Sequence, residues 1–199
     1  MELREIHFNY MKEILNLGIG KAANILNSML NSHIIMSIPE IELVNSGNMN
    51  YLEETEKMAV VELPFNGVLS GVSMLVFPLE TSHKLVQVLI EFEDDDDFNS
   101  DFDAVSAGSL SEIGNIVLNS VMGMFANTLN LSLQYTLSSF HEETFNEMLK
   151  DIDAGENSIL LARVSFTVES LDLNGDILIF FETWSVNTLI KLINNLIET

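Results

Sequence analysis

The chain has 199 residues, 47% of them hydrophobic, and 30 acidic against 8 basic side chains give it a formal net charge of −22. Such a charge disfavours contact with nucleic-acid phosphates or an anionic membrane, so we expect no nucleic acid partner and no membrane insertion. The absence of cysteine excludes disulfides and thiolate-bound zinc. The first residues show no signal-peptide pattern, and no apolar run reaches the roughly 20 residues that span a bilayer, so we expect a cytoplasmic protein.

The first half of the chain predicts a long helix, then strands, then a short helix. Apolar residues recur at helical spacing over residues 5–30, which predicts one amphipathic helix. Strand-like segments rich in β-branched residues follow, interrupted by Pro39, Asn45-Ser46-Gly47 and Asn66-Gly67; they cover residues 34–44, 58–65 and 68–77, the last two as a hairpin. An apolar stripe after the candidate caps Thr81 and Ser82 predicts a shorter helix.

An acidic run over residues 91–103 divides the chain. It contains neither Pro nor Gly, and such a run of like charges repels itself and stays solvated. It does not match the spacing of a calcium-binding loop, which requires a Gly after the first ligands. We therefore predict a linker over residues 93–103.

The same order of elements returns after the linker. A long helical pattern covers residues 105–129, a strand-like segment residues 131–140, and a short charged helix residues 141–152. Strands are predicted over 159–171 and 177–181, around a turn at Leu173-Asn174-Gly175-Asp176, and a last helix over 185–196.

The register of the two halves indicates an internal duplication. Glu13 and Glu112 lie 99 positions apart, as do Asn16 and Asn115. Later pairs are separated by 104 positions: Gly71 and Gly175, Phe77 and Phe181, and Leu85 and Leu189. We predict one domain over residues 1–199, made of two repeats at about 5–92 and 104–197. The expected fold class is α/β (α+β), a pseudo-two-fold unit with an antiparallel-rich sheet and both long helices on one face.

Most familiar catalytic patterns are missing from the sequence. There is no G-x-S-x-G motif, and the four histidines are scattered without ligand spacing. The fragment Gly18-Ile19-Gly20-Lys21 lacks the first glycine of a phosphate-binding loop and lies inside a helical pattern. We therefore expect no metal or cofactor of the protein's own.

The candidate site consists of two Glu-x-x-Asn pairs, Glu13 with Asn16 and Glu112 with Asn115. Residues three apart on a helix are neighbours, so each pair places a carboxylate beside a carboxamide. One such pair alone fits an ordinary solvated helix face. Its recurrence at corresponding places in both repeats, next to Ile14 and Ile113, favours a function.

These residues carry a resemblance to a known family. The strings KEILNLGIGKAANIL (12–26) and SEIGNIVLNSV (111–121) resemble the phosphatase motifs of the CheC/CheX/FliY chemotaxis family, with CheC the most similar layout. The resemblance implies an enzyme, a phosphatase that hydrolyses the aspartyl phosphate of a CheY-like response regulator in two-component signalling. It also implies that Mg²⁺ belongs to the receiver substrate, and that Glu13 and Glu112 pair with a receiver lysine.

The chemistry of the substrate suits these residue types. An aspartyl phosphate is an activated acyl phosphate, so its hydrolysis needs a well-placed in-line water more than a strong base. A carboxamide cannot act as a base near neutral pH, but it can accept from and donate to that water. Asn16 and Asn115 are therefore the predicted water-orienting residues. Additional amides at Asn24 and Asn119, and the acidic run before the second long helix, do not support equal sites.

A second class of function stays open. The chain could serve as a non-catalytic adaptor that binds a phosphorylated receiver or a CheD-like deamidase, with residues 141–152 as a docking surface. The same charged segment also fits a solvated helix face. A purely structural component of the flagellar switch is the weaker third reading.

Overall fold

The computed structural model describes residues 3–44, 56–90, 101–152 and 159–198. In chain order the elements are α1 (Glu5–Leu30), β1 (Ile34–Met36), β2 (Glu40–Val44), β3 (Lys57–Gly67), β4 (Gly71–Pro78), α2 (Leu79–Ile90), α3 (Asp101–Thr128), β5 (Leu133–Tyr135), β6 (Ser139–Thr144), α4 (Phe145–Ile152), β7 (Ile159–Val168), the 3-10 turn η1 (Glu169–Leu171), β8 (Leu173–Phe181) and α5 (Thr183–Ile197). Both predicted long helices are present, as α1 and α3. The acidic stretch 91–100 and the predicted turn at Asn45-Ser46-Gly47 lie outside the described residues, and residues 101–103 of the predicted linker form the start of α3.

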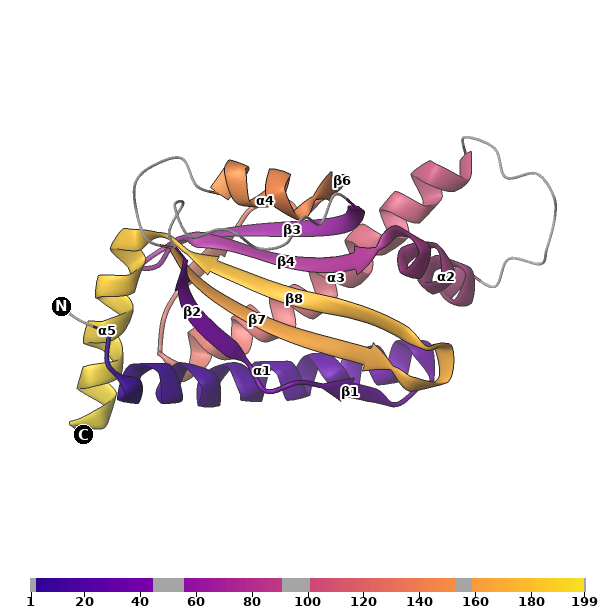
Figure 1. The fold of residues 1–199 in the computed structure, drawn as a ribbon. Coiled ribbons are helices and arrows are strands. Elements are labelled where there is room, and N and C mark those ends of the chain that lie inside the picture. Colours follow the sequence, from indigo (N-terminus) through magenta and orange to yellow (C-terminus); the bar gives the residue numbers. More distant parts are fainter. Residues whose placement is uncertain (1–2, 45–55, 91–100, 153–158, 199) are drawn as a thin grey trace.

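One antiparallel sheet of eight strands joins both halves of the chain (Figure 1). The strand order is β1-β7-β8-β4-β3-β5, with β2 beside β1 on β7 and β6 beside β5 on β3. Strands β1 and β2 of the first half pair with β7 of the second, whereas β5 and β6 of the second half pair with β3 of the first. The halves meet where β4 pairs with β8. Each half therefore completes the sheet of the other, as the predicted pseudo-two-fold arrangement requires.

The long helices cover one face of this sheet. Alternate residues of β3 point to opposite faces, since side chains alternate along a strand. Ala59 and Val61 belong to the main core together with Ile14 of α1 and Ile113 of α3, whereas Val60 belongs to a second cluster on the other face. That second cluster is closed in part by Phe145 and Met148 of α4. The predicted fold class is confirmed.

Residues 141–144 do not form the start of a helix, contrary to prediction. They belong to β6, where His141 pairs with Val60 of β3. The helix α4 begins only at Phe145, after a capping box. The Glu147 carboxylate accepts from the Thr144 backbone N–H at 2.8 Å, and the Glu147 backbone N–H donates to the Thr144 hydroxyl at 3.3 Å. The helical periodicity across this segment concealed a strand that pairs at long range.

The predicted turn at residues 173–176 is also wrong. These residues lie in β8, and the chain reverses earlier, through η1 and Asp172, whose φ is 50°. Gly175 is required by packing instead. A Cβ there would lie 2.6 Å from Cζ of Phe166 and 2.8 Å from Cδ1 of Phe77.

Smaller differences concern the ends of elements. The predicted strand 34–44 is divided around Pro39 into β1 and β2, and the predicted strand 131–140 is divided into β5 and β6. Strand β3 continues through Asn66-Gly67, so the hairpin turns at residues 68–70. Helix α2 begins at Leu79, before the predicted caps, and the Ser82 hydroxyl donates to the Leu79 carbonyl at 2.8 Å.

Candidate functional site

The first Glu-x-x-Asn pair lies on the solvent face of α1. Glu13 and Asn16 are exposed, while Ile14, Leu15 and Ile19 are buried against the core. This division follows from the apolar spacing of the helix, because the apolar residues form one stripe that faces the core and the polar residues lie on the opposite face. The carboxylate and the carboxamide are thus held on one face of a 26-residue helix.

The second pair repeats this arrangement on α3. Glu112 and Asn115 are exposed, and Ile113, Val117 and Leu118 are buried. The positions that are exposed and buried around Glu112 are those expected from the 99-residue register. The structure therefore places all four predicted site residues on helix surfaces, as two separate pairs, one from each repeat.

Two glycines set how closely these helices pack. At Gly18 an added Cβ would lie 2.8 Å from the backbone oxygen of Val121 on α3, so α1 and α3 approach each other with no room for a side chain. At Gly114 an added Cβ would lie 2.4 Å from Cγ1 of Val61, so α3 rests directly on β3. Both glycines therefore fix the positions of the site-bearing helices. At Gly20, by contrast, an added Cβ would meet no heavy atom of the described residues within 4 Å, apart from its chain neighbours and the nearby backbone of α1 itself.

The surroundings of the two asparagines differ. Nδ2 of Asn119 donates to Oδ1 of Asn115 at 2.7 Å and to the backbone oxygen of Asn115 at 2.7 Å. The corresponding position on α1 is Gly20, which has no side chain. Within the described residues the side chain of Asn16 has no hydrogen-bond partner. The sequence did not support equal sites, and this hydrogen bond supplies one physical difference between them.

Each asparagine is followed by an exposed apolar residue, which the sequence analysis did not single out. Leu17 is 53% exposed and Ile116 is 38% exposed. They occupy corresponding positions, because 17 plus 99 equals 116. Single exposed apolar side chains are common on protein surfaces. An apolar residue directly after the asparagine in both pairs is the sequence signal by which Leu17 and Ile116 could have been found.

The carboxylates of both pairs are free of ion pairs within the part of the chain that the structure describes. Each therefore faces solvent as an unneutralised negative charge on a strongly acidic protein. Such a group can attract a cation, and it is not engaged in an ion pair that holds the described fold together.

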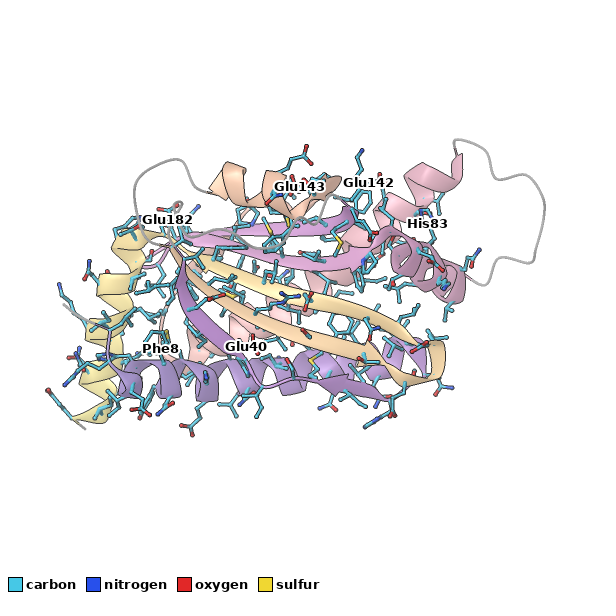
Figure 2. The ribbon with its side chains drawn as sticks, in the orientation of Figure 1. Phe8, Glu40, His83, Glu142, Glu143 and Glu182 are labelled. Carbon is cyan, nitrogen blue, oxygen red and sulfur yellow. The ribbon has the colours of Figure 1, made fainter. Side chains whose placement is uncertain are left out.

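Neither pair belongs to the cavity that the described residues form. A cavity of about 240 Å³ lies on the opposite side of the sheet, with Met74, Met148 and Phe180 in its lining. Glu143 beside α4 and Glu182 just before α5 also line it (Figure 2). The Glu-x-x-Asn pairs instead lie on open helix surfaces, which suit contact with another macromolecule better than enclosure of a small substrate.

The described residues contain no cluster of three or more His, Cys, Asp or Glu side chains that could hold a metal ion. Among the helices in the described ranges, none has the length and apolar character needed to cross a bilayer.

Comparisons with known proteins place the fold. No family model matches the chain. It is 22% identical over 166 residues to the CheY-P phosphatase CheC of Bacillus subtilis, covering 80% of this chain and 79% of that protein.

Solved structures agree with this similarity. A solved chain of Thermotoga maritima FliY superposes with a TM-score of 0.72 at 14% identity, covering 98% of this chain and 99% of that chain. The CheX–CheY–BeF3–Mg complex of Borrelia burgdorferi matches with a TM-score of 0.54 at 20% identity, covering 83% and 96%. The FliM middle domain of H. pylori matches with a TM-score of 0.66 at 10% identity, covering 96% and 99%. The chain is thus similar in sequence to CheC and has the CheC/CheX/FliY-type chemotaxis fold.

Proposed function

We propose that this protein is a phosphatase that accelerates hydrolysis of the aspartyl phosphate on a CheY-like response regulator, with Asn16 and Asn115 orienting the attacking water. The observation that carries this proposal is the doubled pair. Glu13 with Asn16 and Glu112 with Asn115 are exposed on corresponding faces of α1 and α3. Two repeats that keep the same polar pair at the same exposed positions favour a shared chemical role over two coincidences.

The reaction requires orientation above all. The water oxygen attacks phosphorus in line with the bond from phosphorus to the aspartyl oxygen; that bond breaks, and the receiver carboxylate and inorganic phosphate leave. Because the leaving group is already a good one, the main contribution left for the phosphatase is to fix the position of the water. The oxygen of Asn16 or Asn115 can accept a hydrogen bond from that water, while the amide nitrogen can donate to a phosphoryl oxygen.

The glutamates attract a cation of the receiver and hold the helix in position over it. Glu13 and Glu112 are exposed and free of ion pairs within the described residues, so each can bind a cation presented by the receiver. We assign this cation to a receiver lysine. Since the glutamate lies one helical turn from the asparagine, such a salt bridge would place the carboxamide over the phosphoryl group. The Mg²⁺ ion is expected on the receiver.

The surface around each pair suits a protein substrate. The exposed side chains of Leu17 and Ile116 lie next to the asparagines and offer apolar contact in addition to the charge. The similar proteins also support a protein substrate of the CheY type. CheC of Bacillus subtilis is described as a CheY-P phosphatase, and CheX of Borrelia burgdorferi forms a complex with CheY, BeF3 and Mg²⁺.

The test is the decay of receiver phosphate in the presence of the protein. Asn16→Ala and Asn115→Ala should each lower the acceleration, and the double variant should abolish it while remaining folded. Asn187→Ala on α5 is the matched control, because Asn187 is an exposed helical asparagine outside both pairs. If the double variant accelerates decay as well as the unmodified protein does, the asparagines do not carry the activity.

A non-catalytic adaptor is the alternative, and the similarity to the FliM middle domain favours keeping it. In this role the protein would bind a phosphorylated receiver or a CheD-like deamidase without changing the lifetime of the phosphate. Helix α4 and its capping residues Thr144 and Glu147 are the candidate docking surface for a deamidase. A stable complex with a phosphorylated receiver and unchanged phosphate decay would establish the adaptor reading.

A further inference from the structure

We propose that Asn119 is a positioning residue that fixes the carboxamide of Asn115 and makes the second Glu-x-x-Asn pair the faster of the two. This inference rests on the proposed phosphatase function and names a residue that acts within one of its sites. It starts from the hydrogen bonds between Asn119 and Asn115 on α3.

The geometry determines the orientation of both amides. An amide oxygen and nitrogen are hard to distinguish by shape, so their assignment must follow from hydrogen bonding. The backbone oxygen of Asn115 can only accept, and therefore the Asn119 atom 2.7 Å away must be its nitrogen. The same nitrogen lies 2.7 Å from the Asn115 side chain, so the atom that Asn115 presents to it must be Oδ1.

The consequence is a carboxamide held ready for the water. Oδ1 of Asn115 has two lone pairs, so it can accept from Asn119 and still accept from a water molecule. Its Nδ2 is turned away from Asn119 and keeps both hydrogens available for donation. Holding one polar side chain in place before binding avoids an ordering cost equivalent to roughly a two- to tenfold change in rate.

The first pair has no hydrogen bond that corresponds to the one between Asn119 and Asn115. The residue that corresponds to Asn119 is Gly20, since 20 plus 99 equals 119. Asn16 has no side-chain hydrogen bond within the described residues, so its amide must be ordered when the receiver binds. A Cβ added at Gly20 would lie in open space, because beyond its chain neighbours and the nearby α1 backbone no heavy atom of the described residues lies within 4 Å of it. The asparagine at this position can therefore be removed from the second pair and introduced into the first by mutation.

The experiment uses two single-site backgrounds and a phosphorylated CheY-like receiver. In Asn16→Ala, where only the second pair works, adding Asn119→Ala should lower kcat by roughly two- to tenfold with little change in KM. In Asn115→Ala, where only the first pair works, Gly20→Asn should raise kcat by a similar factor over Gly20→Ala. The alanine variant controls for helix propensity, which both substitutions improve. An unchanged kcat with Asn119→Ala, or equal rates for Gly20→Asn and Gly20→Ala, overturns the inference and leaves the proposed function intact.

A second measurement is independent of turnover. Order parameters of the side-chain amides, from nitrogen-15 relaxation of the full chain, should be higher for Asn115 than for Asn16, and Asn119→Ala should lower the Asn115 value. Equal values for the two asparagines overturn the positioning role. If the unmodified protein does not accelerate receiver dephosphorylation at all, the proposed function fails instead, and the order parameters still decide whether Asn119 holds Asn115.

Discussion

Two glycines two residues apart on α1 should respond in opposite ways to the same substitution. Alanine gains about 1 kcal/mol over glycine inside a helix, and this gain applies to both Gly18→Ala and Gly20→Ala. At Gly20 no contact opposes this gain, because beyond the chain neighbours and the nearby α1 backbone no heavy atom of the described residues lies within 4 Å of the new Cβ. Gly20→Ala should therefore stabilise the protein by about 1 kcal/mol.

At Gly18 the new Cβ would lie 2.8 Å from the backbone oxygen and 3.0 Å from Cα of Val121. Backbone atoms cannot rotate away, so α1 and α3 must separate, and such overpacking costs about 1–3 kcal/mol. Subtracting the helix gain leaves Gly18→Ala between neutral and about 2 kcal/mol destabilised. The two variants should thus differ by about 1–3 kcal/mol in the free energy of unfolding.

Calorimetry measures this difference directly. For a chain of this size each kcal/mol shifts Tm by about 2–4 °C, so Gly18→Ala should melt roughly 2–12 °C below Gly20→Ala. Urea unfolding gives the same comparison at constant temperature. Equal melting temperatures would show that the close approach of α1 to α3 does not limit the packing, and the reasoning from the Gly18 contact would be wrong.

Three further predictions concern single side chains. Ser120 is buried and its hydroxyl has no hydrogen-bond partner among the described residues, so Ser120→Ala should stabilise the fold by about 1 kcal/mol in urea unfolding; a loss of stability would mean that the hydroxyl is bonded. Leu17→Ser and Ile116→Ser should change Tm little, because both residues are partly exposed, but raise KM for the phosphorylated receiver; an unchanged KM would remove them from the docking surface. Glu13→Gln combined with Glu112→Gln should weaken receiver binding and flatten its salt dependence, and an unaltered salt dependence would contradict their pairing with a cation.

Local periodicity was sufficient to predict the long helices. The apolar spacing in residues 5–30 and 105–129 reflects contacts within a few turns, and α1 and α3 occupy these ranges with small shifts at their ends. The duplication was predicted from local information as well, because corresponding side chains keep the same register in the two halves. The exchange of strands between the halves was not visible. Strand pairing is a long-range contact, and β1 could pair with a strand of either half without any change in its own pattern.

The errors around α4 and β8 have physical causes. Residues 141–144 are all polar and carry no apolar pattern of their own, so only the pairing with β3 decides that they form a strand. The capping box of Thr144 and Glu147 was a local signal that could have placed the helix start correctly. The Asn174-Gly175 pair suggested a turn. In the structure Gly175 instead lies in a strand, where the rings of Phe77 and Phe166 occupy the space that a Cβ would need.

The candidate site divides in a similar way. Exposure of Glu13, Asn16, Glu112 and Asn115 followed from the helical pattern alone. The hydrogen bond from Asn119 to Asn115 could not be predicted from this pattern, because an asparagine four residues along a helix can equally face solvent. A hydrogen bond between two side chains depends on their rotamers, which the spacing does not determine.

We propose that the two asparagines, Asn16 and Asn115, carry the phosphatase activity. The most direct measurement is the rate of phosphate loss from a phosphorylated CheY-like receiver, with the unmodified protein, with Asn16→Ala combined with Asn115→Ala, and with the control Asn187→Ala. We expect acceleration by the unmodified protein and the control, and decay at the spontaneous rate with the folded double variant. Acceleration by the double variant equal to that of the unmodified protein would contradict it.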